Sequence, residues 1–424
     1  MAQVSNVVEA LRYTYMADRV AYLFNEESVA YNILGKVKKS QGGRTNQFLM
    51  PILVQNPGAF TGISEGGSLP SALQPDTTEA YFDLQEYVGL YDVTWKLIQD
   101  SRNSKFAFQQ AIQMLDEGLR RRVIRNLNSD FIDDGRGRLA VLPAADNDTT
   151  VTVNALPRLE KGMVVDLMDT DDATKNTDSA TVTAVDPVNR TITLSANSGS
   201  TGAGDYLVIQ DTTDSPTCLH TNGLLGIIDS ANPPTVVGNY GAINRSTAGN
   251  EFWQAVELGN SGTNRALTED LMLQAMDYAR EKGSGMVKAW ISNLAIVRRY
   301  HEMLRAEAFF ALNSMSPIGG GLGRKSMGDN SPSGEGTTPY NFSGVPWHVE
   351  PYFAANTIVG LDTDHFFMGV GENETPRPIS EIFDNVPFFR QTTSATFEVA
   401  WYYQCEILSD NPAAGVKIAD ISES

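Results

Sequence analysis

The stretch SKFAFQQAIQMLDEGLRRRVIRNLNSDF, from Ser104 to Phe131, indicates how the rest of the chain is organised. Its apolar residues are spaced by threes and fours, at Phe108, Ile112, Leu115, Leu119, Val123, Leu127 and Phe131. This spacing predicts one amphipathic helix of about 42 Å, with Asn103 or Ser104 as its N-cap. We interpret it as a spine to which other parts are attached; the alternative is an ordinary long helix of an α+β enzyme.

The composition is that of a soluble globular protein of two to four domains, with 424 residues, 42% of them hydrophobic and 20% charged. The 32 basic and 51 acidic residues give a formal net charge of −19. This balance argues against an overall nucleic-acid binder, which needs a basic surface, but suits a surface that faces DNA without adhering.

Cysteine content and hydropathy limit the class further. Cys218 and Cys405 are too few for a disulfide framework or a Cys-rich zinc site, so two buried thiols are expected. The first residues lack the basic and apolar regions of a secretory signal, and no apolar run reaches the ~18 residues of a membrane span. We therefore expect a soluble protein made inside the cell.

Before the helix, the sequence predicts a projecting hairpin. Residues 3–34 predict one or two short helices, and Lys36–Arg44 predicts a flexible basic arm or hinge. Strands are predicted over Phe48–Gln55 and Tyr81–Trp95, joined by the Gly-, Ser- and Thr-rich stretch Gly58–Glu79. The exposed edges of such a hairpin favour self-assembly. Four residues of the second strand are expected on one face: Phe82, Leu84, Val88 and Leu90.

After the helix, which is expected to end near Asp133–Gly135, two compact regions follow. From Val141 to Thr217 the sequence predicts an inserted small barrel or sandwich. Its five strands are expected at residues 151–153, 163–168, 180–186, 191–194 and 206–210. From Gly223 an α/β lobe is predicted. The lobe is expected to contain two helices (267–282, 294–308), a buried strand (287–291) and a Gly/Ser-rich loop (313–338). Later strands are expected at residues 345–349, 357–361, 366–370 and 395–408.

Several motifs resemble catalytic or binding sites but lack the required surroundings. Gly62–Gly66 matches the nucleophile elbow around Ser64, yet a strand rather than a helix follows it. The stretch GGGLGRKS at 319–326 places its lysine out of P-loop register, so a mobile loop is predicted. Asp169–Asp178 lacks the glycine and glutamate of an EF-hand, which leaves a surface acidic turn or a weak calcium site.

The remaining polar clusters have two interpretations each. An apolar strand is followed by Asp362, Asp364 and His365. These residues form either an active-site cluster or a polar turn at the end of the strand. Four histidines show no metal-ligand spacing: His220, His301, His348 and His365. The arginines of the helix form either a solvated face or a salt-bridge surface for a neighbouring subunit, which we favour: Arg120, Arg121, Arg122 and Arg125. No catalytic constellation emerges, so no enzyme activity, cofactor or metal is expected.

The order of these pieces resembles that of the major capsid proteins of tailed bacteriophages, the Hong Kong 97-type fold. TTEAYFDLQEYVGLYDVTWKLIQDS (Thr77–Ser101) is similar to the return strand of that family's E-loop, which leads to its spine helix. MVKAWISNLAIVRRYHEML (Met286–Leu304) is similar to a strand and helix of its axial (A) domain. FSGVPWHVEPYF and IVGLDTDHFFMGV are similar to the strand pair before the last strand of its peripheral (P) domain.

The resemblance implies an α+β, Hong Kong 97-type capsid fold with an inserted small β-barrel-like domain. It divides the chain into an N-terminal arm (1–47), the E-loop hairpin with flanking P-domain strands (48–100), the P-domain spine helix (101–140), the inserted β-rich domain (141–217), the A-domain (218–350), and returning P-domain strands with a C-terminal A-domain segment (351–424).

The resemblance also implies a function. Hexamers and pentamers of the chain would form the icosahedral shell of a tailed phage, in a virion assembled from protein made in the host bacterial cytoplasm. The shell would enclose double-stranded DNA without sequence-specific binding or a membrane, with a separate scaffolding protein, a portal and, where present, a decoration protein as partners. Contacts between subunits are expected at Phe60, Ile63, Glu65, Leu69, Arg120, Arg121 and Arg122.

Other interpretations stay open. The loop Gly58–Glu79 has no lysine, so a lysine–asparagine cross-link through it is not expected. An encapsulin-like compartment shell would have the same fold. A soluble hydrolase using Ser64, or a carbohydrate-binding module within Val141–Thr217, would belong to other classes of protein.

Overall fold

The computed structural model describes residues 29–38, 47–55, 58–71, 74–94, 105–154, 156, 158–172, 174–214, 217–234, 237–311, 340–350, 353–371, 377–378, 389–390 and 396–423. The predicted N-cap, the helical segment before Val29 and the stretches 313–338 and 319–326 lie outside these residues.

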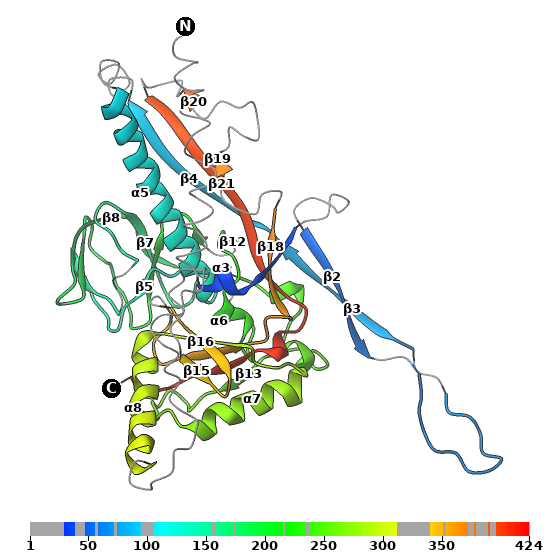
Figure 1. Cartoon of the computed structure of the whole chain (residues 1–424). Helices are drawn as coiled ribbons and strands as arrows, with labels where there is room; N and C mark the ends of the chain where they lie inside the picture. Colours follow the sequence, from blue (N-terminus) through cyan, green and yellow to red (C-terminus); the bar gives the residue numbers. More distant parts are fainter. Residues whose placement is uncertain are drawn as a thin grey trace.

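The predicted spine is the helix α5 (Lys105–Ile132), which runs along one side of the molecule (Figure 1). Its last turns carry Ile124, Leu127 and Phe131 into the main hydrophobic core. The helix ends at Ile132, and Gly135 takes a φ of +92°, a left-handed conformation that suits glycine. The helix and its end are therefore as predicted from the apolar spacing.

Beside α5 lies a six-stranded sheet built on the long strand β21 (Thr396–Ser409) (Figure 1). Its other strands are β1 (Gly35–Lys38), β4 (Gln85–Thr94), β18 (Phe366–Val370), β19 (Arg377–Pro378) and β20 (Phe389–Arg390). Strands β4 and β21 pair antiparallel from Gln85↔Cys405 to Thr94↔Thr396. The main core forms where this sheet meets α5, the short helices α3 (Val29–Ile33) and α6 (Leu224–Ile227), and the 3-10 helices η2 (Tyr240–Ala242) and η3 (Glu251–Trp253).

Two sequence predictions near this sheet are wrong. The strand predicted over Tyr81–Trp95 is two strands, β3 (Asp76–Asp83) and β4, in different sheets. At Leu84 the inward-facing positions change from even to odd numbers, so Val88 and Leu90 are exposed while Tyr91 and Val93 are buried. A shift of one residue reverses the face that every later side chain occupies.

The second error concerns the basic segment that begins at Lys36. Instead of a flexible arm, residues 35–38 form β1, which pairs parallel with β18 from Gly35↔Phe367 to Lys38↔Val370. Lysines suit an edge strand because their ammonium groups stay outside the core, and the Lys36 ammonium lies 3.6 Å from the centre of the Tyr31 ring. Residues 39–46 are not among the described residues.

Residues 140–209 form a separate six-stranded sheet in the order β5-β10-β7-β8-β9-β6. Its strands are β5 (Ala140–Val141), β6 (Thr150–Thr152), β7 (Val164–Met168), β8 (Lys175–Asp186), β9 (Thr191–Leu194) and β10 (Tyr206–Ile209). After β6, the Asn154 amide donates to the Val141 carbonyl at 2.9 Å, which links the last strand to the first. The sheet encloses its own apolar core, which is consistent with the predicted small barrel or sandwich, and we call these residues the barrel. The short pair β11 (Thr213–Asp214) and β12 (Thr217–Cys218) follows.

The α/β lobe predicted from Gly223 onward has a third six-stranded sheet. Its order is β13 (Val256–Leu258), β22 (Val416–Ile418), β17 (Ile358–Leu361), β14 (Ala289–Ser292), β16 (Val345–Val349) and β15 (Tyr340–Phe342), with helices α7 (Glu269–Gly283) and α8 (Leu294–Ala311) and the 3-10 helix η4 (Pro412–Ala414). Thr268 caps α7 by accepting from the Leu271 amide at 3.2 Å. Because β22 pairs with both β13 and β17, the C-terminal strand completes this sheet.

Candidate assembly surface

A two-stranded hairpin projects from the body (Figure 1). It consists of β2 (Gln47–Gln55) and β3, which pair antiparallel from Gln47↔Asp83 to Gln55↔Asp76. In the described part of the chain, these two strands pair only with each other. Phe48 and Phe82 at the base pack against the main core. The base is therefore anchored, and the hairpin carries the loop 58–71 away from the molecule.

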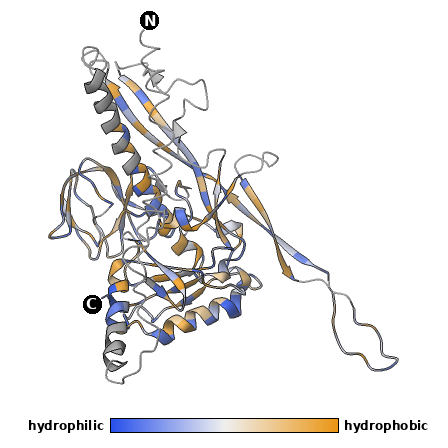
Figure 2. Ribbon diagram, viewed as in Figure 1, coloured by the Kyte–Doolittle hydropathy of each residue, from blue (hydrophilic) through white to orange (hydrophobic). Residues whose placement is uncertain are grey.

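Large apolar side chains on this hairpin lie in solvent. Phe60 is 106% exposed, Leu69 82% and Ile63 54%, all in the loop. On the strands, Leu49 is 56% and Leu53 is 52% exposed, and Figure 2 shows hydrophobic residues along the hairpin, outside the body. Contiguous exposed apolar surface usually marks an interaction site. The structure thus brings three of the predicted contact residues, Phe60, Ile63 and Leu69, onto one projecting loop.

The charge of this region has a single sign. Residues 47–94 contain no lysine, arginine or histidine, and they carry the acidic residues Glu65, Asp76, Glu79, Asp83, Glu86 and Asp92. Glu65, the fourth predicted contact residue of the loop, is exposed. A surface that is both apolar and acidic best fits a partner that offers apolar side chains with nearby basic groups.

The arginines of the spine were predicted to contact a neighbouring subunit. Within the chain, Arg122 and Arg125 form ion pairs with the Glu160 carboxylate of the barrel, at 3.4 and 2.7 Å. The Arg122 side chain is still 50% exposed, so this pair leaves it accessible. The side chains of Arg120 and Arg121 are outside the described part of the structure. These pairs tie the barrel to the spine helix.

Ser64 does not lie in a nucleophile elbow. It lies in the exposed turn of the hairpin loop, where its carbonyl accepts from the Gly67 amide at 2.9 Å. The next described residues, 67–71, belong to neither a helix nor a strand. The strand–turn–helix geometry that supports a catalytic serine is therefore missing.

The polar residues that follow β17 form a turn, and they are not brought together as a catalytic cluster. The Lys288 ammonium binds Asp362 at 3.0 Å and also contacts Asp364. His365 points to another partner, the Asp410 carboxylate, at 2.8 Å. Of the two predicted buried thiols, Cys405 is buried and Cys218 is half-buried.

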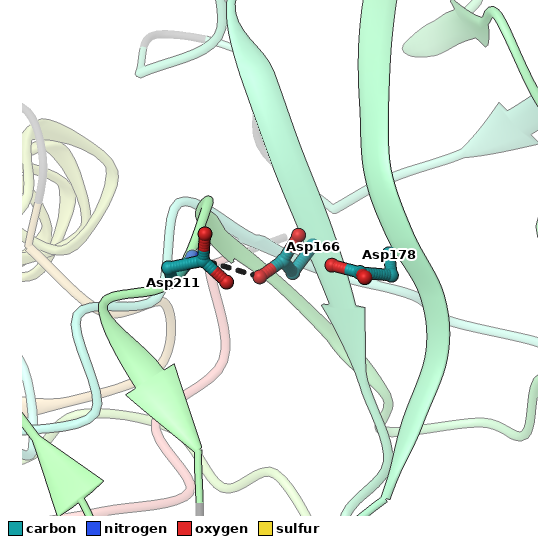
Figure 3. A group of neighbouring side chains, drawn as sticks. All are labelled: Asp166, Asp178 and Asp211. Carbon is teal, nitrogen blue, oxygen red and sulfur yellow. Dashed lines mark hydrogen bonds between the residues drawn. The ribbon is translucent and has the colours of Figure 1, made fainter.

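The carboxylates of Asp166, Asp178 and Asp211 gather on the barrel, with ligand atoms within 4.8 Å of one another (Figure 3). The Lys175 ammonium lies 3.1 Å from Asp166 and 3.3 Å from Asp211. Burial opposes ionisation of Asp166, but hydrogen bonds from the Asp211 and Ser179 amides and from Lys175 hold its pKa below the usual range. The lysine therefore supplies the positive charge that a metal ion would supply.

Calcium is expected to leave the stability of the chain unchanged. In the acidic turn Asp169–Asp178, Asp172 already binds Arg136 and Tyr206, and Asp171 accepts from Thr174. Calcium at about a hundred times the dissociation constant of a site would add about 2.7 kcal/mol to the free energy of unfolding. We expect about 5 mM calcium to shift the Tm by less than about 1 °C relative to sodium chloride of equal ionic strength. A rise of several degrees in the Tm would show that calcium binds the folded chain, contrary to this expectation.

Two features of the structure are not predicted by the sequence. Leu49, Leu53 and Tyr81 are 56%, 52% and 45% exposed, although alternating apolar residues in a strand normally face a core. The second feature is a buried polar joint that contains Asp130 and His220. It was not predicted because these residues are 90 positions apart in the sequence. A histidine between two short strands and a helix carries no sequence signal for such a joint.

The chain has the architecture of a viral shell subunit: a projecting hairpin, a spine helix beside a long-stranded sheet, and an α/β lobe. Neither a family model nor a curated protein sequence matches it. Among solved structures, it is similar to the cyanophage A-1(L) capsid asymmetric unit, with a TM-score of 0.52 and 13% identity over 96% of this chain and 95% of that chain. This similarity shows that the chain has the fold of a bacteriophage capsid protein.

Two further similar structures have lower scores. The capsid of a native GTA particle has a TM-score of 0.43 and 11% identity, over 96% of this chain and 92% of that chain. A structure from Mycobacterium phage Bobi has a TM-score of 0.41 and 10% identity, over 98% of this chain and 97% of that chain. Within the described residues, no helix is both long and apolar enough to span a membrane.

Proposed function

We propose that this chain is the major capsid protein of a tailed double-stranded DNA phage, a non-enzymatic subunit of an icosahedral shell in the virion. The observation that carries the proposal is the projecting hairpin, with Phe60 106% and Leu69 82% exposed, on a chain with a phage capsid fold. A monomer leaves these side chains in water, whereas a second copy of the chain would cover them. Hexamers and pentamers provide such neighbours throughout a closed shell.

The structure supports the Hong Kong 97-type division of the chain. The hairpin β2–β3 with its loop corresponds to the E-loop, and α5 with the sheet of β21 corresponds to the P-domain. The sheet from β13 to β15, with α7 and α8, corresponds to the A-domain. The barrel of residues 140–209 is the inserted domain, and Glu160 connects it to the spine through Arg122 and Arg125.

The charge of the chain supports the proposed contents of the shell. A formal net charge of −19 disfavours adhesion of the subunit to DNA, as expected of a shell that holds the nucleic acid without binding it. The loop Gly58–Glu79 contains no lysine, so we expect no lysine–asparagine cross-link through it. A separate scaffolding protein and a portal complete the proposed set of partners.

Size-exclusion chromatography of the expressed chain, alone and with the scaffolding protein of the same virus, tests the proposed assembly. We expect the chain to elute in the void volume as large particles under at least one of these conditions. A monomer that stays monomeric under both conditions would contradict the proposed function.

Charge reversal at Arg121 is expected to impair assembly without unfolding the subunit. The proposed contact residues are Phe60, Ile63, Glu65, Leu69, Arg120, Arg121 and Arg122, and an acidic loop docking near the arginines requires their charge. We expect Arg121→Glu to reduce the assembled fraction about tenfold or more, as measured by sedimentation velocity, with an unchanged circular dichroism spectrum of the monomer. The control is Lys161→Glu, at an exposed position of the barrel; normal shells from Arg121→Glu would remove this contact.

A further inference from the structure

Three consecutive residues, His220, Thr221 and Asn222, link the end of α5 to the strand β21. The His220 Nδ1 lies 2.9 Å from the Asp130 carboxylate of α5. On the other side, the Asn222 amide and side chain donate to Glu406 Oε1 at 2.8 and 2.9 Å. Between them, the Ile407 amide donates to the Thr221 hydroxyl at 3.3 Å. We call this group of contacts the spine joint.

Tyr87 of β4 closes the spine joint. Its hydroxyl donates to Asp130 at 3.1 Å and accepts from the Thr221 amide at 2.8 Å. Hydrogen bonds thus run without interruption from the helix, through Tyr87 and Thr221, to the long strand. The segment 220–222 and Tyr87 together thus form a polar connection between the spine and the sheet.

The spine joint is sealed from solvent. Asp130 is 5% exposed, His220 7% and Glu406 0%. The backbone of Gly137 covers the imidazole so closely that a Cβ there would lie 2.2 Å from the His220 Nε2. Among the described residues, neither the His220 Nε2 nor the Glu406 Oε2 has a hydrogen-bond partner. A charge on Glu406 would therefore lie in an apolar interior with only one of its oxygens bonded.

The charged groups around the spine joint are mostly acids. The titratable side chains that face His220 and Glu406 are Asp130, Asp133, Tyr87, Tyr240, Cys218 and Cys405. Of the nearby arginines, Arg138 binds Asp133 at 2.8 Å, and Arg158 attracts both Asp133 and Asp130. While His220 is protonated and Glu406 is neutral, Glu406 adds no negative charge to the joint, and the His220 imidazolium lies beside the Asp130 carboxylate. If both protons leave, Glu406 gains a buried negative charge and Asp130 loses the imidazolium beside it.

We propose that the spine joint is a proton-dependent clamp, which holds α5 to β21 while His220 and Glu406 are protonated and opens when they are not. Burial raises the pKa of Glu406 to about 8 despite the hydrogen bonds from Asn222. Burial lowers the pKa of His220, but the Asp130 carboxylate outweighs it and raises the value above the usual range. The clamp is a property of the folded subunit and does not depend on the proposed shell.

The direction of the pH dependence follows from these shifts. Both groups have a higher pKa in the closed joint than in an open one, where ordinary values of about 4.3 for glutamate and 6.5 for histidine apply. Their stabilising contribution is therefore complete below the ordinary values and is lost as the pH rises through the shifted ones. For Glu406 the opening constant rises about tenfold per pH unit between these two values.

The two cysteines of the sequence report directly on this opening. Cys405 is 0% exposed and precedes Glu406 in β21, and the Cys218 thiol donates to the Gly135 carbonyl at 3.0 Å. Iodoacetamide labelling of Cys405 in the unassembled full chain, followed by mass spectrometry, measures opening at pH 6.5 and 8.5. Glu406→Gln, which keeps an acceptor for Asn222 but does not ionise, separates opening from the thiol's own chemistry. We expect the labelling rate to rise at least tenfold more between these pH values in the wild type than in the variant.

An equal rise in both proteins would overturn the clamp. If Glu406→Gln does not fold, Ser64→Cys in the exposed hairpin loop provides an internal reference thiol within the otherwise unchanged chain. The ratio of Cys405 labelling to labelling of this reference thiol should then rise about tenfold or more from pH 6.5 to 8.5. A constant ratio contradicts the clamp, and so does loss of the circular dichroism spectrum at pH 8.5, which would mean that the whole chain unfolds.

Discussion

The triple variant Phe60→Ser, Ile63→Ser, Leu69→Ser is expected to remain a folded monomer that forms no shells. These side chains are 106%, 54% and 82% exposed, so their loss costs the isolated subunit less than about 0.5 kcal/mol each. In an assembled shell, burial of each one contributes about 1.5–3 kcal/mol. Because every subunit repeats the contact, we expect the assembled fraction to fall by more than about tenfold in sedimentation velocity.

The matched control lies in the same loop. Ser64→Ala changes an exposed polar residue between Ile63 and Leu69 and should assemble as the wild type does. The same control tests the hydrolase interpretation, since loss of an esterase activity in Ser64→Ala would favour a catalytic serine. Shells of normal yield from the triple variant would show that the hairpin loop is not an assembly contact.

Gly223→Ala is expected to have the largest effect on folding. A Cβ at this position would lie 2.0 Å from the Asp133 carbonyl oxygen and 2.6 Å from that of Asp130, so the end of α5 would have to move. Gly223 has an ordinary φ of −88°, so the cost comes from space alone. We expect a loss of about 3 kcal/mol or more in the free energy of unfolding, measured in urea on the unassembled chain.

Gly118→Ala is the control for this prediction. Gly118 lies within α5, and among the described residues nothing beyond its chain neighbours and the backbone of its own helix lies within 4 Å of the position that its Cβ would occupy. Alanine in an open helix interior is more favourable than glycine by about 0.5–1 kcal/mol, so this variant should be slightly more stable than the wild type. Equal urea midpoints for Gly223→Ala and Gly118→Ala would mean that the helix end is not packed as described.

Local patterns predicted most of the elements correctly. The spacing of Leu115, Leu119 and Val123 was enough for α5, and alternation with turn residues was enough for the barrel strands. The strand over Tyr81–Trp95 was wrong because alternation continues through Leu84, and only tertiary structure shows where the chain changes sheets. A short basic edge strand, such as β1, has the composition of a loop.

Contacts between distant residues were beyond sequence reasoning. The candidate loop follows from its glycine content and from the resemblance to capsid proteins, and its four residues, exposed in the structure, stay a prediction. The spine joint joins residues that are 90 and 184 positions apart, and no spacing rule connects them. Arg122 likewise has a partner in the barrel, Glu160, that its helix position did not indicate.

Electron microscopy of purified assemblies tests the central claim most directly. The chain, expressed with its scaffolding protein, should form closed icosahedral shells in which the hairpin of each subunit lies against a neighbouring copy. Reconstruction should show hexamers and pentamers, with Phe60 and Leu69 covered at the contact. Small cages loaded with an enzyme would instead identify an encapsulin-like compartment, and a chain that forms no closed particle would contradict the account.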